Sequence, residues 1–252
     1  MSGAAATSAT AGAARPGELL LRCRSLVVGY RGEGLLPPLD LELRRGTLVG
    51  VLGRNGSGKS TWFKTLLGLL RPVAGRVERS APGLRMAYVP QSAGLDAILP
   101  LSARDVVAQG RLTGTSFLRP WASAEDRRVV AGALEAVGVA GLARRRFRDL
   151  SKGQQQRVLF ARMLATRADL ALLDEPTAAM DVEGEREAVA ELARLAHGER
   201  MAVVLVTHAL ELAERNCDEL IVFDRPARRV VHGPSAEVAG GALYRRLRGE
   251  LA

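Results

Sequence analysis

One octapeptide constrains the fold of this chain more than any other part of the sequence. Residues 53–60 read Gly-Arg-Asn-Gly-Ser-Gly-Lys-Ser, which matches the pattern G-x-x-x-x-G-K-[ST]. The apolar residues 48–52 precede it, and apolar residues follow at helical spacing over residues 61–70. Glycines let backbone N–H groups close around phosphate oxygens, and a helix N-terminus adds partial positive charge. The sequence therefore predicts a phosphate-binding loop between a strand and a helix.

Two side chains of this loop suit the chemistry of a bound nucleotide. Lys59 is expected to reach the β and γ phosphates, and Ser60 to coordinate Mg²⁺. Lysine occurs elsewhere only at positions 64 and 152, so a compact ammonium at position 59 in an arginine-rich chain is informative. None of these lysines lies in the Asn-Lys-x-Asp motif that reads guanine. The other residues expected to contact the nucleotide here are Gly53, Arg54, Asn55, Gly56, Ser57, Gly58 and Thr61.

A pair of carboxylates follows the apolar run at residues 170–173. Asp174 suits a hydrogen bond to Mg²⁺-bound water, and Glu175 suits polarisation of an attacking water. Two solvated loop carboxylates are the alternative interpretation. It is less favoured, because a buried strand would bring the pair to a sheet edge where α/β proteins bind ligands.

The chain alternates between strand and helix patterns on both sides of a helical segment. Strands are predicted at residues 19–30, 39–44, 48–52 and 86–89, then at 170–173, 201–207 and 219–223, with a helix at 183–196. Between residues 92 and 164 helical patterns dominate, as at 124–137 and 154–164. This alternation predicts an α/β fold with a mainly parallel sheet and right-handed crossovers.

A third motif, Leu150-Ser151-Lys152-Gly153-Gln154, identifies the family when it is taken together with the first two. Alone it predicts only a helix capped by Ser151. In order with the two other motifs, it resembles the signature of the ATP-binding cassette (ABC) family, with Lys152 in place of a glycine. Residues 53–60 and 170–175 then resemble its Walker A and Walker B motifs. Smaller matches are the adenine-stacking Tyr30, the Q-loop Gln91, the D-loop Asp181 and the switch His208.

The resemblance implies an α/β fold with a RecA-like P-loop core, an N-terminal antiparallel β portion and an inserted helical subdomain. Residues 1–17, rich in Ala, Ser, Thr and Gly, are expected to be a disordered tail rather than a signal peptide. Residues 18–252 would form one ABC ATPase domain, with its core at 18–91 and 165–252 and its helical subdomain at about 92–164.

The resemblance also implies that two protomers sandwich two ATP molecules. Lys59, Glu175 and His208 would be catalytic. Ser60, Gln91 and Asp174 would hold Mg²⁺, and Tyr30 would stack on adenine. The opposite protomer would supply the signature residues Ser151, Gly153 and Gln154, and Asp181 of the D-loop would also contact the nucleotide.

The expected partners are a membrane permease, a second ATPase protomer and an extracytoplasmic substrate-binding protein. No apolar run approaches the roughly 20 residues that span a bilayer, so any membrane role is expected to go through a partner. The resemblance implies a peripheral subunit at the cytoplasmic face of the inner membrane. The net charge of +9 is also compatible with nucleic acid. An export-type cassette and a cassette acting on nucleic acid or the ribosome stay as alternatives. No nucleic acid is expected, since the sequence shows no zinc-binding cysteine pair, long coiled coil or tandem cassette.

A local resemblance bears on the transported substrate. Residues 88–91, Asp96, Leu99-Pro100 and residues 103–111 resemble ATPases of metal-ion uptake systems, first the zinc and manganese group and then the iron–siderophore group. Leu99 stands where an aromatic residue is usual. The resemblance thus implies an ATPase that drives uptake of a metal ion or metal chelate. Trp62 is assigned to packing, and Cys23 and Cys217 to free thiols in a reducing compartment.

Overall fold

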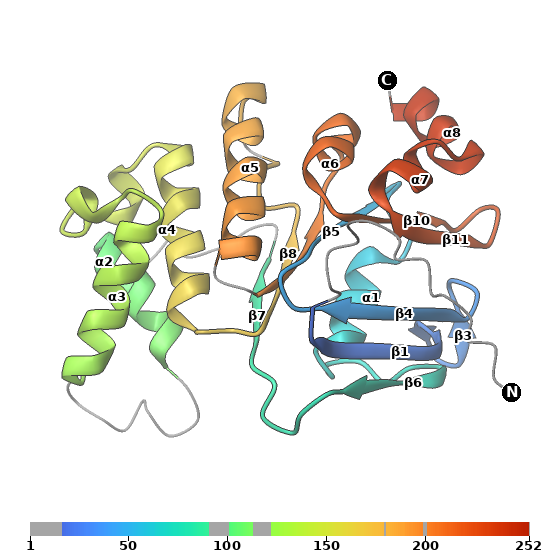
Figure 1. The fold of residues 1–252 in the computed structure, drawn as a ribbon, viewed down its shortest axis with the longest axis horizontal. Helices are drawn as coiled ribbons and strands as arrows, with labels where there is room; N and C mark the ends of the chain where they lie inside the picture. The colour runs from blue at the N-terminus through green and yellow to red at the C-terminus, as the bar shows by residue number, and fades with distance from the viewer. Residues whose placement is uncertain (1–16, 91–100, 113–121, 179, 199–200, 252) are drawn as a thin grey trace, which may run out of the picture.

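A six-stranded sheet lies at the centre of the computed structural model (Figure 1). The structure describes residues 17–90, 101–112, 122–178, 180–198 and 201–251. The strand order is β11-β10-β5-β9-β8-β7, and all neighbours are parallel except the edge pair β10 and β11. These strands are β5 (Leu48–Gly53), β7 (Met86–Val89), β8 (Leu170–Asp174), β9 (Ala202–Val206), β10 (Glu219–Asp224) and β11 (Arg229–Pro234). The predicted mainly parallel sheet is confirmed.

A second, three-stranded antiparallel sheet confirms the predicted N-terminal β portion. Its order is β4 (Leu39–Arg44), β1 (Leu19–Val27) and β6 (Ala74–Arg79). The predicted strand at residues 19–30 is divided, because β2 (Gly29–Tyr30) pairs with β3 (Glu33–Gly34) in a separate hairpin. Strand β6 was not predicted, since its residues are mostly exposed and lack a clear apolar face.

Both faces of the central sheet are buried, so its strands carry apolar residues on both sides. In β8, Leu170 and Leu172 pack with the antiparallel strands and helix α1 (Lys59–Leu66). Ala171 and Leu173 point to the opposite face, toward the helical layer. That layer contains α5 (Val182–Gly198), α6 (Leu210–Asn216), α7 (Ser235–Ala239) and α8 (Ala242–Leu251). Figure 1 shows α1 and the layer of α5 and α6 on opposite sides of the sheet.

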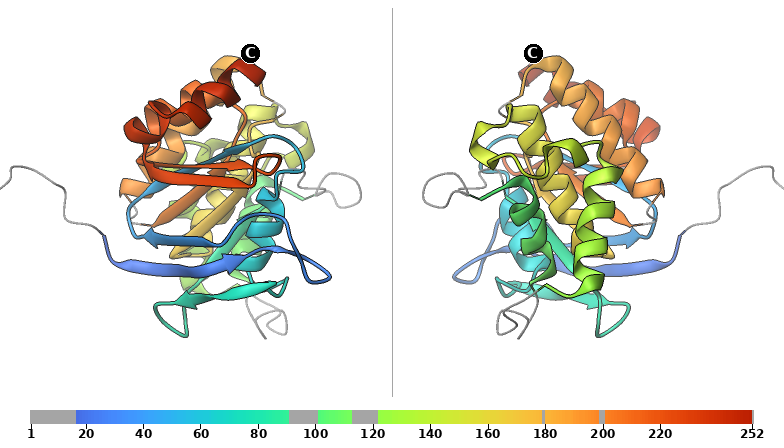
Figure 2. Two further views of the ribbon diagram at one scale, coloured as in Figure 1. Left: turned by 90° about the vertical axis from the view of Figure 1, so that its right-hand side faces the viewer. Right: turned by 90° about the vertical axis from the view of Figure 1, so that its left-hand side faces the viewer.

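The described residues between β7 and β8 include three α-helices, which pack on one another (Figure 2). They are α2 (Ala103–Ala108), α3 (Ala124–Ala136) and α4 (Lys152–Ala165). The described connecting segments contain the 3₁₀ turns η1 (Gln109–Arg111), η3 (Ala140–Leu142) and η4 (Phe147–Asp149). Each α-helix begins with a capping box, whose caps are Ser102, Ser123 and Ser151. The caps satisfy the first backbone N–H groups and fix where each helix starts. The predicted subdomain boundaries near 92 and 164 stay predictions.

Helix α1 is shorter than the sequence pattern predicts. It ends at Leu66 rather than near residue 70, because Gly68 adopts a left-handed φ of 79° that closes the helix. Among the described residues, no helix is both long and apolar enough to cross a bilayer.

Among the described residues, Trp62 is the largest fully buried side chain, which confirms its assignment to packing. Its ring lies 5.7 Å from the rings of both Phe63 and Phe223, between the two sheets.

We expect Trp62→Ala to lower the free energy of unfolding by about 3–5 kcal/mol, since it leaves a cavity in this core. Denaturant unfolding measures the change. Leu69→Ala, at a side chain 72% exposed, is the control and should change stability little.

Cys23 and Cys217 are free and buried, and burial raises the pKa of each thiol to about 12. Both groups therefore stay protonated at pH 8, and because only the thiolate is a strong nucleophile, both are unreactive.

We expect iodoacetamide to modify neither cysteine in the folded protein and both in urea, as measured by intact mass. Rapid labelling of the folded protein at either position would contradict this burial.

Candidate functional site

Parallel strand pairing brings the ends of β5, β8, β9 and β10 to one edge of the central sheet. Gly53 lies opposite Phe223, and Asp174 lies opposite Val206. The loops that leave these strand ends carry residues 53–60, Glu175 and His208. Ligands of open α/β sheets bind at the carboxyl ends of the strands, so this edge is the candidate site.

The phosphate loop at residues 53–60 depends on glycine. Gly56 and Gly58 adopt left-handed φ values of 76° and 105°, which favour glycine. At Gly53, a Cβ atom would lie 2.7 Å from the carbonyl oxygen of Phe223, so no larger residue fits. Arg54, Asn55 and Gly56 are exposed, whereas Ser57, Gly58 and Lys59 are buried. The loop thus leads directly into helix α1, whose first residue is Lys59.

The ammonium of Lys59 lies beneath this loop. Its Nζ donates hydrogen bonds to the carbonyl oxygens of Gly53 at 2.7 Å and Arg54 at 3.1 Å. Burial lowers its pKa, and the nearby negative charges of Glu175 and Asp174 oppose that shift. A cation therefore stands between the loop and two carboxylates, where it can balance the charge of a phosphate group.

Ser60 and Asp174, 114 positions apart in the sequence, meet at this edge. Ser60 Oγ donates to Asp174 Oδ2 at 2.9 Å, and Tyr88 Oη donates to the same oxygen at 3.5 Å. Burial and the charge of Asp174 raise the pKa of Tyr88. A hydroxyl and a carboxylate are the hard oxygen ligands that Mg²⁺ prefers, so the pair fits the ion. Gln91, the third predicted ligand, lies outside the described residues.

Glu175 and His208 form a hydrogen-bonded pair. The distance from His208 Nε2 to Glu175 Oε1 is 2.7 Å, and their side chains are 37% and 13% exposed. Glu175 has a left-handed φ of 47°, unusual for a residue with a side chain. Its N–H donates to the carbonyl of Val206, which ties the carboxylate to the end of β9. The structure thus places two predicted catalytic residues in contact.

Tyr30 lies beside the start of α1. Thr61 Oγ1 donates to Tyr30 Oη at 3.2 Å, and the tyrosine is 47% exposed. An aromatic ring with an open face next to a phosphate loop can stack on a planar base.

The signature residues gather elsewhere. Ser151, Gly153 and Gln154 line a cavity of about 280 Å³ with Met180, and the described residues around that cavity include none of residues 53–60. Ser151 Oγ accepts from the N–H of Gln154 at 3.3 Å, as a helix cap. Asp181 caps α5, accepting from the N–H of Gly184 at 2.8 Å. Within one chain, therefore, these four predicted nucleotide contacts do not share a cavity with the phosphate loop.

A groove of about 340 Å³ between β7 and the inserted helices was not predicted. Arg162, Tyr88 and Leu112 lie along it, and Leu112 is 60% exposed. Arg162 is half-buried, and its guanidinium has no hydrogen bond or ion pair with any described residue. Burial lowers its pKa. The sequence signal was an arginine within the otherwise apolar helix end at residues 158–165.

Comparisons with known proteins agree with the motifs. The family model described as ABC transporter matches residues 36–178. A zinc import ATP-binding protein, ZnuC of Brucella melitensis biotype 1, is 37% identical over 98% of this chain and 77% of that protein. The chelated iron transport system membrane protein YfeB of Yersinia pestis is 38% identical over 77% of this chain and 67% of that protein.

Solved structures agree as well. A metal-chelate type ABC transporter in an inward-facing conformation matches with a TM-score of 0.78 and 29% identity, over 90% of each chain. The family assignment from the ordered motifs is confirmed by sequence and by fold. The chain belongs to the ABC transporter family, as a nucleotide-binding ATPase subunit.

Proposed function

We propose that this protein binds and hydrolyses ATP to drive uptake of a metal ion or metal chelate through a separate membrane permease. The contact of Glu175 with His208 carries the proposal. It places a candidate base at the same sheet edge as the phosphate loop with Lys59 and the candidate ion ligands Ser60 and Asp174. The names of the zinc and chelated-iron relatives support the choice of metal.

Each side chain has a distinct task in this proposal. Lys59 neutralises phosphate charge that the loop N–H groups also bind. Glu175 orients and polarises the attacking water, and His208 holds its carboxylate in place through the 2.7 Å hydrogen bond. Ser60, Asp174 and the predicted ligand Gln91 would hold Mg²⁺. When bound, that ion offsets the charge of the phosphate oxygens.

The separation of the signature from the phosphate loop supports a two-protomer site. Residues 151–154 open helix α4, where backbone N–H groups and a helix N-terminus suit an anion. Because they line a cavity apart from residues 53–60, they are available to a nucleotide held by a second copy. ATP would then hold the two protomers together, and its hydrolysis would remove that contact.

The groove beside Arg162 supports docking of the permease. It lies between core strand β7 and the inserted helices, and it includes part of the segment at residues 88–91 and 103–111 that resembles metal-ion uptake ATPases. Apolar side chains and a cation without a partner among the described residues suit a permease segment that carries a carboxylate. The protein would thus act at the cytoplasmic face of the membrane, together with an extracytoplasmic binding protein.

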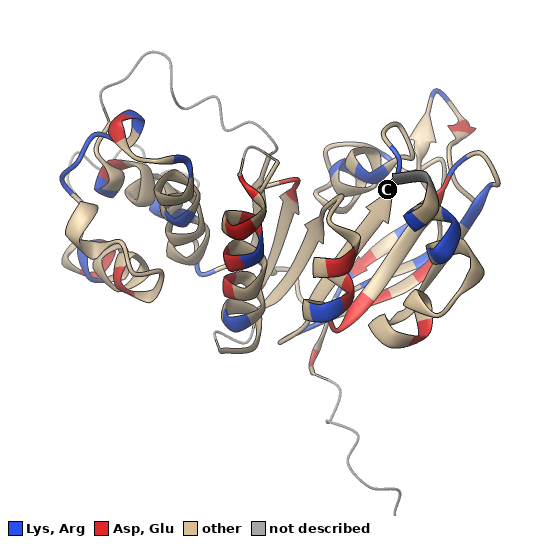
Figure 3. Ribbon diagram, turned by 90° about the horizontal axis from the view of Figure 1, so that it is seen from above, with Lys and Arg blue, Asp and Glu red and all other residues tan. Residues whose placement is uncertain are grey.

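A nucleic-acid role has less support. Positive and negative residues are interspersed along the ribbon in Figure 3, as on α5, where Arg194 pairs with Glu191. A surface that binds the backbone of nucleic acid requires a stripe of positive charge, and helix α5 does not carry one.

We expect Glu175→Gln to keep ATP binding and lose at least about a hundredfold in the rate of hydrolysis, since the amide cannot take a proton. Release of phosphate measures the rate, and gel filtration with ATP should show a stabilised dimer. Lys59→Ala is the companion variant and should lose nucleotide binding. Turnover of Glu175→Gln at the wild-type rate would remove Glu175 from its assigned role.

We expect the tagged protein to co-purify with a multi-span permease and a metal-binding extracytoplasmic protein from gently solubilised membranes. Arg162→Glu should lose the permease, because it places a carboxylate opposite a carboxylate. Arg128→Glu, at an exposed arginine of α3, makes the same charge change and should retain it. Recovery of ribosomes or DNA-repair proteins with no membrane protein would contradict the transport proposal.

A further inference from the structure

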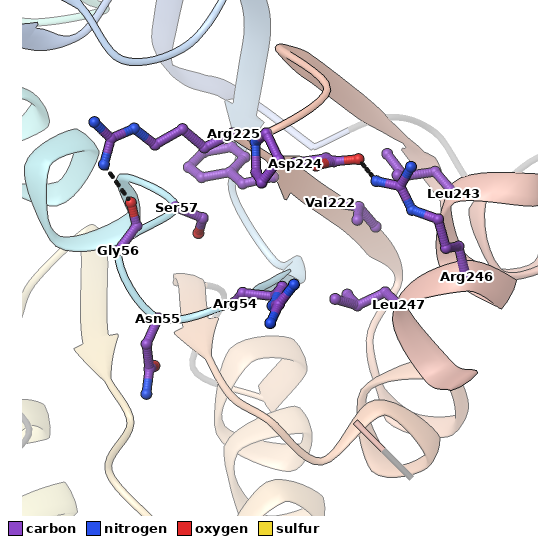
Figure 4. A pocket seen from close by; sticks show the side chains of 12 residues that line it. Arg54, Asn55, Gly56, Ser57, Val222, Asp224, Arg225, Leu243, Arg246 and Leu247 are labelled. Atoms are coloured by element: carbon purple, nitrogen blue, oxygen red, sulfur yellow. Dashed lines mark hydrogen bonds and ion pairs between the residues drawn. The ribbon is translucent and has the colours of Figure 1, made fainter. Parts of the chain in front are cut away.

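The outer side of the phosphate loop borders a cavity of about 480 Å³ beneath the C-terminal helix α8 (Figure 4). One wall is the loop itself, residues 54–57, and the opposite wall is Leu243, Arg246 and Leu247 of α8. The end of β10 and the turn after it, residues 222–226, join the two walls. None of the predicted nucleotide contacts explains why these three elements meet here.

Two polar contacts connect them, and Figure 4 draws both. Arg225 Nη1 donates to the carbonyl oxygen of Gly56 at 3.2 Å. The neighbouring Asp224, only 7% exposed, forms an ion pair with Arg246 of α8. Its other carboxylate oxygen accepts from the N–H of Ala227 at 3.2 Å, which fixes the turn that carries Arg225. A continuous set of contacts therefore runs from α8 to the phosphate loop.

A phosphate loop needs such support because it binds anions through its N–H groups. Its carbonyl oxygens repel phosphate, so donors that hold them turned away keep the N–H groups facing the anion. Lys59 satisfies the carbonyls of Gly53 and Arg54, and Arg225 satisfies that of Gly56. Gly56 has a left-handed φ of 76° and no side chain, so its peptide can rotate easily unless a neighbour holds it.

We propose that Arg225 is a positioning residue of the phosphate loop, held in place by the Asp224–Arg246 ion pair of the C-terminal helix. The proposal rests on the proposed function, since it concerns the affinity of the same loop for ATP. Arg225 acts through the Gly56 carbonyl and not on the nucleotide. Its loss should therefore weaken nucleotide binding while leaving the chemical step intact.

The test is nucleotide affinity, measured with a fluorescent ATP analogue on the full chain. Arg225→Ala should weaken binding about three- to tenfold, the effect of one partly exposed hydrogen bond from a charged group. KM for ATP should rise by the same factor, with kcat nearly unchanged. Arg229→Ala removes an equal charge at an exposed arginine four positions away and should bind as the wild type does.

A double-mutant cycle tests the role of α8. Arg246→Ala should weaken binding in the wild-type background and have no further effect in Arg225→Ala, because both changes release the same carbonyl. Arg246→Lys, which keeps the charge, should restore most of the affinity. Thermal unfolding of each variant distinguishes a specific loss of affinity from a general loss of stability, which would lower Tm without changing affinity.

The outcomes separate the two proposals. Equal affinity of Arg225→Ala and wild type, or fully additive effects of Arg225→Ala and Arg246→Ala, would overturn the positioning role and leave the ATPase proposal standing. Failure of the wild type itself to bind the analogue would overturn the proposed function, and the positioning role with it.

Discussion

The parallel pairing of β5 with β9 and β10 is the constraint on which the rest of the structure depends. Val51 lies opposite Val206, and Gly53 lies opposite Phe223. This register brings the phosphate loop beside the loop of His208 on one side and the turn of Arg225 on the other. A shift of one residue would exchange the two faces of β5, both of which are buried in separate hydrophobic clusters. The core therefore fixes the site by excluding other registers.

Charge balance then determines what this edge can bind. Lys59 lies near Asp174 and Glu175, and each carboxylate also has a hydrogen-bonding partner of its own, Ser60 and His208. Such partners reduce the cost of keeping charged groups away from water. Lys59, Asp174 and Glu175 are thus already in place at this edge before a polyphosphate binds. Preorganisation of this kind limits the reorganisation that accompanies the reaction.

Much of the fold could be predicted from the sequence because its signals are local. The glycine pattern at 53–60, the apolar run at 170–173 and the serine cap at 151 each contain their own physical reason. Contacts between distant residues left no such signal. Nothing in the sequence near Asp224 indicates that Arg246 pairs with it. The charged sequence of β6 likewise does not show the apolar pattern that predicts a strand. The pairing of Ser60 with Asp174 could be inferred only indirectly, because each side chain suits Mg²⁺ in its own motif.

The cap of helix α4 affects how the fraction of protein with bound ATP depends on the concentration of the protein itself. Ser151 Oγ accepts from Gln154, and a hydroxyl that accepts can still donate its proton. The signature is thus already ordered in a single chain, and under the proposed function it needs little rearrangement to receive a phosphate. If that phosphate belongs to a second copy, dimerisation and nucleotide binding are linked by mass action. The fraction of protein carrying ATP would then rise with the amount of subunit as well as with the amount of ATP.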